Sequence, residues 1–231
     1  MFGNEKHSQK IGQPDLNTSK RAIDIVIAFL DVCLPLFPKY LQKYPPVSPK
    51  EKRLSRKLAT FLNDESRTRK SIFMILTEYD EIESERTDDF GFIKFKNYRE
   101  KRESDNAFFV MEAKRLPTPT PPKSREREYV EGNLGGIERF KRGHHGAGLA
   151  QSAMVAYVQN ETCSHWHTKV NGWIQDLIDI SVLPEIVWNS DDLLIFQNQF
   201  DTTFKYQSRN KRIHQGKVDE ILLQHYWLPL Q

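Results

Sequence analysis

The sequence predicts an α/β domain in which helices flank a central mixed β-sheet. Asn106–Leu116 begins with aromatic and branched residues on both faces of a strand, as in a strand that is covered on both sides. Two more strand-like segments, Ser71–Tyr79 and Asp89–Phe95, precede it. Apolar stripes with helical spacing lie at 48–62 and 161–180. A chain of 231 residues is long enough for one sizeable domain of this kind.

Composition and charge narrow the class of protein. Residues 1–47 are expected to form an N-terminal arm and helix, and 48–231 the main domain. The formal net charge of +3 permits nucleic-acid binding without requiring it. Cys33 and Cys163 are too few for a disulfide scaffold, which favours a reducing compartment. Residues 1–19 are polar and unlike a signal peptide, so a cytoplasmic location is expected.

The first predicted helix, Ala22–Leu34, is apolar around most of its circumference. Asp24 and Asp31 are its only charged residues, and their spacing of seven places them on one face. The segment is too short to cross a membrane and carries two acids. It is either buried in the core of its own domain or lies at an interface, in a homodimer or against a partner protein. In the second case Ile25 and Phe29 are expected on its outer face.

The next helix is predicted to begin near Ser48. Ser48 and Glu51 suit a capping box, with Pro49 at the first helical position, so the simplest role of Glu51 is a cap. The two strands named above follow. The charged stretch Lys96–Asp105 is then expected to be a solvated hairpin loop, with contacts to phosphates as the alternative.

The strand at Asn106–Leu116 ends in charged residues. Because side chains alternate along a strand, Glu112 and Lys114 point to the same side. Asp89 opens the preceding strand, and across a hairpin its carboxylate can converge with that of Glu112. Two carboxylates and a backbone carbonyl form a site of hard oxygen ligands that suits Mg²⁺. A lysine beside it can orient the attacking water and stabilise charge on a phosphate. The simpler alternative is a strand end at which Lys114 is solvated.

A glycine-rich segment follows at 132–148. It lacks the ending of a phosphate-binding P-loop, and it is either a mobile surface loop or a segment that approaches a nucleic-acid backbone. Leu149–Val158 is predicted to be a helix of small residues, and it contains Gln151 as a further candidate contact. The basic side chains expected to contact nucleic acid are Arg139, Lys141 and Arg142.

Two histidine-containing stretches do not predict a metal site. His144 and His145 are adjacent and would point apart in an extended chain, so a shared metal is not expected. Cys163–His167 contains one cysteine and two histidines but lacks the second ligand pair of a structural zinc site.

The C-terminal third is predicted to hold one helix and three strands. Glu161–Ile180 has the helical stripe. Two short strands, Leu193–Gln197 and Thr202–Gln207, are expected around a turn. Ser208–Arg212 is predicted to be a basic tip, and Val218–Leu228 an edge strand.

The arrangement of Asp89 and Glu112-Ala113-Lys114 on successive strands resembles the P-D…(D/E)-x-K nuclease superfamily, which has the restriction-endonuclease-like fold. Asp89 is followed directly by alternating apolar residues, as in that superfamily, although the proline before it is absent. Families of this fold often carry a glutamate early in the first core helix, which Glu51 matches. Further stretches, Gly136–Phe140 and Met154–Val158, are similar to bacterial nuclease-like proteins, some of them found in phage-defence loci. The resemblance covers about 48–228.

This resemblance implies a Mg²⁺-dependent phosphodiesterase in which Mn²⁺ can substitute. Its implied metal ligands are Asp89, Glu112, the Ala113 carbonyl and Glu51, with Lys114 positioning the water. The implied substrate is DNA ahead of RNA, and the implied setting is the effector subunit of an anti-phage complex. The alternative is a subunit that keeps the fold and binds nucleic acid or assembles with partners without cleaving.

Overall fold

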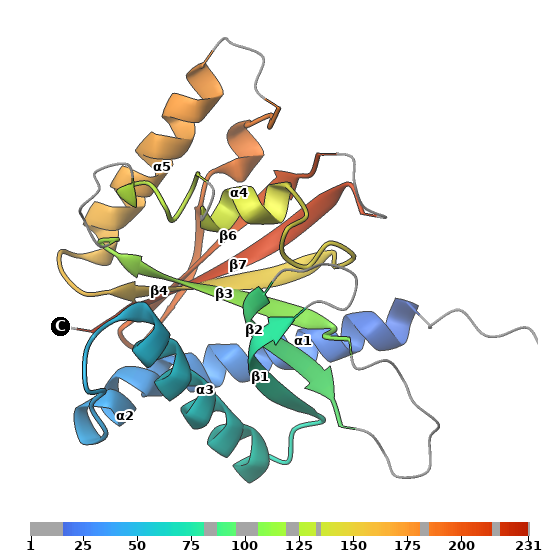
Figure 1. The fold of residues 1–231 in the computed structure, drawn as a ribbon, viewed down its shortest axis with the longest axis vertical. Helices are drawn as coiled ribbons and strands as arrows, with labels where there is room; N and C mark the ends of the chain where they lie inside the picture. The colour runs from blue at the N-terminus through green and yellow to red at the C-terminus, as the bar shows by residue number, and fades with distance from the viewer. Residues whose placement is uncertain are drawn as a thin grey trace, which may run out of the picture.

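A seven-stranded mixed β-sheet forms the centre of the protein (Figure 1). The computed structural model describes residues 16–80, 87–95, 106–118, 125–132, 135–180, 185–213 and 218–230. In spatial order the strands are β1 (Phe73–Asp80), β2 (Thr87–Lys94), β3 (Phe109–Leu116), β4 (Gln151–Val158), β7 (Glu220–Pro229), β6 (Thr203–Lys211) and β5 (Ile195–Phe200). β4 is parallel to both of its neighbours, β3 and β7, and the other pairs are antiparallel. The predicted α/β class with a central mixed sheet is therefore confirmed.

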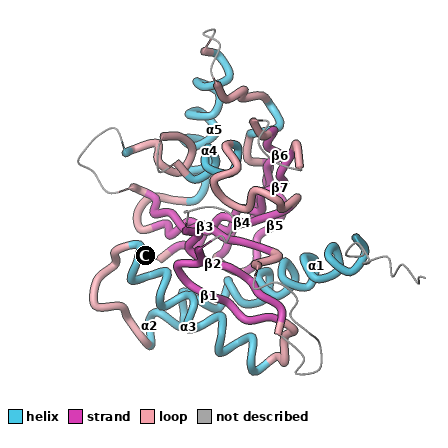
Figure 2. The backbone as a smooth tube through the Cα atoms, turned by 45° about the vertical axis from the view of Figure 1, so that its right-hand side comes forward, coloured by secondary structure: helices cyan, strands magenta, loops and turns pink. Residues whose placement is uncertain are grey.

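Helices cover both faces of the sheet (Figures 1 and 2). One face carries α1 (Leu16–Cys33), the short turn η1 (Leu34–Leu36), α2 (Phe37–Lys43) and α3 (Glu51–Thr68). The other face carries α4 (Gly136–Lys141), α5 (Cys163–Asp179) and the short turn η3 (Ser190–Asp192). The loop expected at 96–105, residues 1–15 of the expected arm and most of the proline-rich stretch after Leu116 lie outside the described residues.

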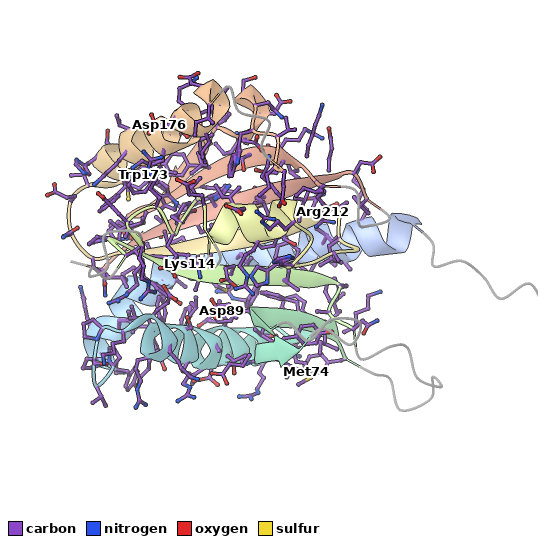
Figure 3. The ribbon with its side chains drawn as sticks, turned by 45° about the horizontal axis from the view of Figure 1, so that its top comes forward. Met74, Asp89, Lys114, Trp173, Asp176 and Arg212 are labelled. Atoms are coloured by element: carbon purple, nitrogen blue, oxygen red, sulfur yellow. The ribbon has the colours of Figure 1, made fainter. Side chains whose placement is uncertain are left out.

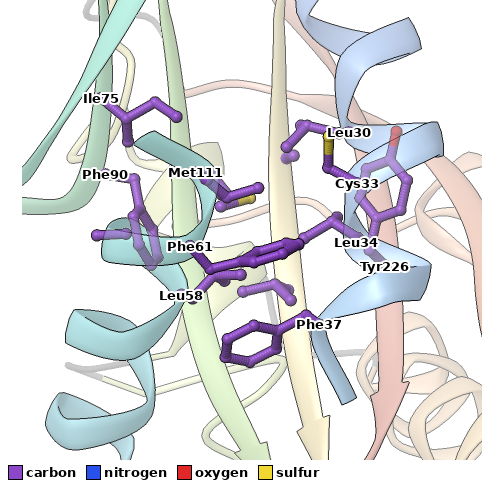
Figure 4. Close-up of a cluster of buried hydrophobic side chains, with 14 of the residues drawn as sticks. Leu30, Cys33, Leu34, Phe37, Leu58, Phe61, Ile75, Phe90, Met111 and Tyr226 are labelled. Atoms are coloured by element: carbon purple, nitrogen blue, oxygen red, sulfur yellow. The ribbon is translucent and has the colours of Figure 1, made fainter. Parts of the chain in front are cut away.

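Each face of the sheet has its own apolar core. On the α1–α3 side, Phe90 and Met111 from the sheet pack with Leu30 of α1 and Phe61 of α3 (Figure 4). α1 thus shares one core with the domain that begins at residue 48. On the opposite side, tryptophans of α5 and β7 pack under α4. Burial on both faces explains the nearly continuous apolar runs of β3 and β4.

α1 is buried on one side only. Val26 and Leu30 are fully buried, and Phe29 is 7% exposed, so the expectation that Phe29 lies on the outer face is wrong. Ile25 and Val32 face outward at 37% and 51% exposure. Asp31 faces the sheet rather than water alone, because it accepts hydrogen bonds from Lys205 and Tyr226. Among the described residues, no helix has the length and apolar character needed to cross a membrane.

Three predicted elements take a different form in the structure. Leu149–Val158 is not a helix: its residues 151–158 form β4, a central strand. The predicted edge strand Val218–Leu228 is β7, which lies between β4 and β6. Ser208–Arg212 is not a tip but continues β6, which runs to Lys211. Short apolar runs fit both a buried helix and a buried strand. The run at 151–158 is a strand because it pairs with parallel strands on both sides, β3 and β7.

The two edges of the sheet differ. At the β1 edge, the Asn63 side chain of α3 donates to the Ile75 carbonyl at 2.8 Å and accepts its N–H at 3.1 Å. Ser66 of the same helix donates to the Phe73 carbonyl at 2.9 Å. At the β5 edge, Asn171 of α5 accepts the N–H of Leu194, the residue before the strand, at 2.9 Å and donates to its carbonyl at 3.1 Å, and a bulge at Gln197 interrupts the register of β5 with β6. Side chains therefore engage backbone groups at both edges, and backbone geometry also distorts the β5 edge.

Candidate active site

The candidate site lies where β2 and β3 separate. The two strands pair from Phe92 with Phe109 to Phe90 with Met111, and their pairing ends there. The next N–H groups of β3 that point toward this gap belong to Ala113 and Arg115.

Two carboxylates accept these N–H groups. Asp89 Oδ2 accepts from Ala113 N–H at 2.8 Å, and Glu51 Oε2 accepts from Arg115 N–H at 3.0 Å. α3 begins at Glu51, and neither a Ser48 cap nor a capping box is present. The predicted cap role of Glu51 is therefore wrong, because its side chain points to β3.

Glu112 and Lys114 point together toward the α4 side of the sheet. Lys114 Nζ donates to Glu112 Oε1 at 2.8 Å, and both side chains are almost completely buried. In the register that Phe90 and Met111 set, Asp89 stands opposite Glu112, and opposite residues share a face. Asp89 and Lys114 accordingly lie close together beside the gap (Figure 3). The structure thus brings together the four side chains that the sequence singled out.

Glu112 has two further partners on the α4 side. His145 Nε2 lies 3.3 Å from Glu112 Oε2, and Arg139 Nη1 lies 3.7 Å from Glu112 Oε1. His145 is fully buried. His144 and His145 were not expected to share a metal, and the structure instead places His145 against the carboxylate of Glu112.

The carboxyl groups have strongly shifted acidities. Burial, together with the charge of Glu112, raises the pKa of Asp89 to about 8. Burial also raises the pKa of Glu51, although Lys114 opposes this. Burial alone would raise the pKa of Glu112, but Lys114 and His145 hold it well below its usual range. Burial alone would lower the pKa of Lys114, but Glu112, Glu51 and Asp89 raise it. The site therefore contains the ion pair of Glu112 with Lys114 and two further carboxyl groups, Asp89 and Glu51, whose negative charge is not fully compensated by a nearby positive charge.

The residues expected to contact nucleic acid occupy different environments. Lys141 is fully buried, and its Nζ lies 2.5 Å from Oδ1 of the fully buried Asp192. It cannot reach a phosphate in this structure, so that expectation is corrected. Arg142 is paired with Glu138 and Glu185. Arg139 lies beside Glu112, as described above, and Gln151 begins β4 rather than lying on a helix.

The glycine-rich segment holds α4 and His145 against the sheet. A Cβ at Gly136 would lie 2.2 Å from Met154 Cε, which would have to move, and 3.0 Å from the Tyr129 carbonyl oxygen, which is backbone, so a side chain there would crowd the contact between α4 and the 129 segment. Arg212 donates to the carbonyls of Phe140, Ala147 and Gly146. Gly135, Gly136 and Gly146 therefore allow close packing, and Gly132, Gly143 and Gly146 adopt a positive φ. The alternation of Ser208 and Asn210 in β6 with Arg212 just after it was the sequence signal that these polar side chains share one buried face.

A polar network is buried next to this face. His225 bonds Tyr129 Oη through Nδ1 and Ser208 Oγ through Nε2, each at 2.9 Å. Trp227 also donates to Tyr129 Oη. Burial lowers the pKa of His225 to about 3, so its ring is neutral in the native protein. The sequence argument gave this histidine no role.

The donor set of the site has the chemistry that Mg²⁺ prefers. Asp89 and Glu51 each use one oxygen for a strand N–H, which leaves their second oxygens outside these two bonds. A cation would compensate the carboxyls whose pKa burial has raised. Within the described ranges, however, no cluster of three or more His, Cys, Asp or Glu side chains is arranged to hold a metal ion. A bound ion would thus depend on individual carboxylates, a carbonyl and water rather than on a preformed cluster of this kind.

Comparisons of the chain with family models, with curated proteins and with solved structures gave no match.

Proposed function

We propose that the protein is a metal-dependent nuclease with a restriction-endonuclease-like fold, which hydrolyses phosphodiester bonds of DNA ahead of RNA in the cytoplasm. One observation carries the proposal: three separate elements bring Glu51, Asp89, Glu112 and Lys114 into one electrostatically linked cluster. A structural role accounts for Asp89 and Glu51 as acceptors of strand N–H groups. It does not account for a buried Glu112–Lys114 ion pair beside them, which is costly to desolvate.

The residues of the chain have distinct roles in this proposal. Asp89, Glu112 and the Ala113 carbonyl would hold Mg²⁺ or Mn²⁺, and Glu51 would add a ligand. When bound, the ion polarises the phosphate and lowers the pKa of water. Lys114 positions the attacking water and stabilises charge on the phosphate through its Nζ. Its ammonium stays protonated because Glu112 raises its pKa, so it acts as a donor rather than as a base.

The direct test is cleavage of plasmid, linear and single-stranded DNA, and of RNA, with Mg²⁺, Mn²⁺ or EDTA. Glu112→Gln and Asp89→Asn should abolish cleavage, while circular dichroism shows a native fold. Lys114→Met should reduce turnover more than metal binding. Glu185→Gln, a carboxylate change on the surface, is the matched control and should remain active. Full activity in Glu112→Gln would refute the assigned site.

A second candidate is a non-cleaving subunit that binds nucleic acid or assembles with partners. This candidate is favoured because the oxygens of the Glu112 carboxylate, which a metal ion would need, already contact Lys114, His145 and Arg139. Binding of DNA or RNA without hydrolysis under either metal would support this candidate. A nuclease that is active only within an anti-phage complex lies between the two, and the outer side of α1 is then the proposed contact with a partner or a second copy.

A further inference from the structure

The first half of α3 has a basic outer surface that the function above does not use. We define the α3 basic face as Lys50, Lys52, Arg53 and Arg56, all of which are exposed. Between Lys50 and Asn63 the only acid is Glu51, whose carboxylate turns inward to Arg115 N–H. The outward charge of this half of the helix is therefore positive only.

The α3 basic face lies next to the candidate site. Its residues flank Glu51, the first residue of the helix and a member of the site. On β1, Thr77 pairs with Phe90 and Tyr79 with Asp88, so the intervening Glu78 stands opposite Asp89. The side chain of Glu78 reaches Lys52 and Arg56 of α3, so the face lies beside the strand position that faces Asp89.

Glu78 supplies an anion to this face. Its carboxylate lies 2.7 Å from Lys52 Nζ and 3.7 Å from Arg56 Nη2. All three side chains are at least half exposed, with 65% for Lys52 and 53% for Glu78 and Arg56. Exposed pairs of this kind contribute little to stability and exchange readily with other ions.

The backbone at Glu78 is also unusual. Its φ of 51° is in the left-handed region, which a residue with a side chain rarely adopts within a strand. The strand thus accepts a local conformational cost at the residue whose carboxylate meets Lys52 and Arg56. Two independent features therefore occur together near Asp89: a helix surface that carries only positive charge, and the carboxylate of Glu78 that is paired with it.

We infer that the α3 basic face binds the phosphodiester backbone of the nucleic acid next to the bond that is cut. In the absence of nucleic acid, the carboxylate of Glu78 occupies the position of a substrate phosphate. This inference rests on the proposed function and names the surface that holds its substrate. The α3 basic face takes the place of Lys141 and Arg142 as the expected contact with phosphates, because Lys141 is paired with Asp192, and Arg142 with Glu138 and Glu185.

The test compares two pairs of substitutions, one in the first turns of α3 and one at and just after its end. Arg53→Gln with Arg56→Gln removes two charges from the α3 basic face. Arg67→Gln with Lys70→Gln removes two exposed charges from the far end, about 21 Å away at 1.5 Å per residue. Net charge changes equally in both, so a general electrostatic effect would weaken both alike. Binding of fluorescein-labelled DNA and RNA is measured by anisotropy in EDTA over a range of salt concentrations, which separates binding from hydrolysis.

The Arg53/Arg56 variant should bind roughly tenfold or more weakly, with a salt slope reduced by about two, while the Arg67/Lys70 variant should match the parent. Glu78→Gln should bind more tightly than the parent. Equal losses in the two double variants, or no loss in either, would overturn the inference. Parent protein that binds no nucleic acid would also overturn it.

The same variants separate this inference from the proposed function. Cleavage by the parent with unchanged kcat/KM in Arg53→Gln with Arg56→Gln would refute the binding surface and leave the nuclease standing. Selective loss of binding in that variant, without cleavage by the parent under Mg²⁺ or Mn²⁺, would establish the surface and refute a nuclease that acts without a partner.

Discussion

Replacing Lys141 by methionine tests whether this lysine is part of the interior or contacts substrate. The ion pair with Asp192 is fully buried, and Lys141 Nζ also lies 4.6 Å from the centre of the Trp188 ring. Burial lowers the pKa of Lys141 and raises that of Asp192, so each charge depends on the other. Removing one partner of a buried pair leaves the other uncompensated, which costs about 3–5 kcal/mol.

This cost should be visible in thermal unfolding. For a domain of this size, 1 kcal/mol shifts Tm by about 2–4 °C, so Lys141→Met should lower Tm by roughly 6–20 °C. The neighbouring Arg142→Met is the control, because Arg142 is partly exposed and its loss should cost less than that of the fully buried Lys141. Adding Asp192→Asn to Lys141→Met should restore part of the loss, since it removes the uncompensated charge.

The reasoning fails if Lys141→Met unfolds at the parent temperature. It also fails if the folded variant loses affinity for DNA while Arg142→Met keeps it, because Lys141 would then contact phosphate as the sequence had suggested. Circular dichroism melting and anisotropy on the same samples give both readings.

Three further predictions follow from particular contacts. Acid should unfold the protein partly through His225, because its folded pKa of about 3 lies below the unfolded value near 6.5. The free energy of unfolding should therefore fall as the pH drops from about 6.5 to about 3, by up to about 5 kcal/mol. His225→Gln should weaken this pH dependence of the free energy of unfolding, measured by urea titration. Asn63→Ala should lower the free energy of unfolding by about 1–3 kcal/mol, because Ile75 N–H and C=O both lose their partner, and unchanged stability would contradict the proposed cap. Val32→Asp should convert a dimer to a monomer in light scattering if α1 contacts a second copy of the chain, and a parent that is already monomeric would refute the homodimer.

Local sequence patterns were sufficient for the strand that carries Glu112 and Lys114. Its alternation fixes which side chains share a face, and that rule does not depend on the rest of the fold. The convergence of Asp89 with this pair also followed from two consecutive strands. The role of Glu51 required more, because its contact with Arg115 N–H spans 64 positions in the sequence.

Other features depend on contacts that no local pattern contains. Lys141 looks like a solvated charge until Asp192, 51 positions away, is placed against it. β4 has small apolar residues that fit a helix as well as a strand, and only β3 and β7 on either side determine its form. His145 is placed by a loop whose carbonyls bind Arg212 from β6. In each case the missing information is the identity of a distant neighbour.

The unequal edges of the sheet limit how copies of this chain can associate through their strands. Strand addition needs a free row of backbone donors and acceptors. At the start of β1 this row is already engaged, because Asn63 bonds both backbone groups of Ile75 and Ser66 bonds the carbonyl of Phe73. If Gln197 were deleted, the uncharged β5 would straighten into a regular edge, and two chains could join there. The joined sheet would end in β1 at both extremities, where the engaged groups of Phe73 and Ile75 leave only the second half of the strand for a further chain.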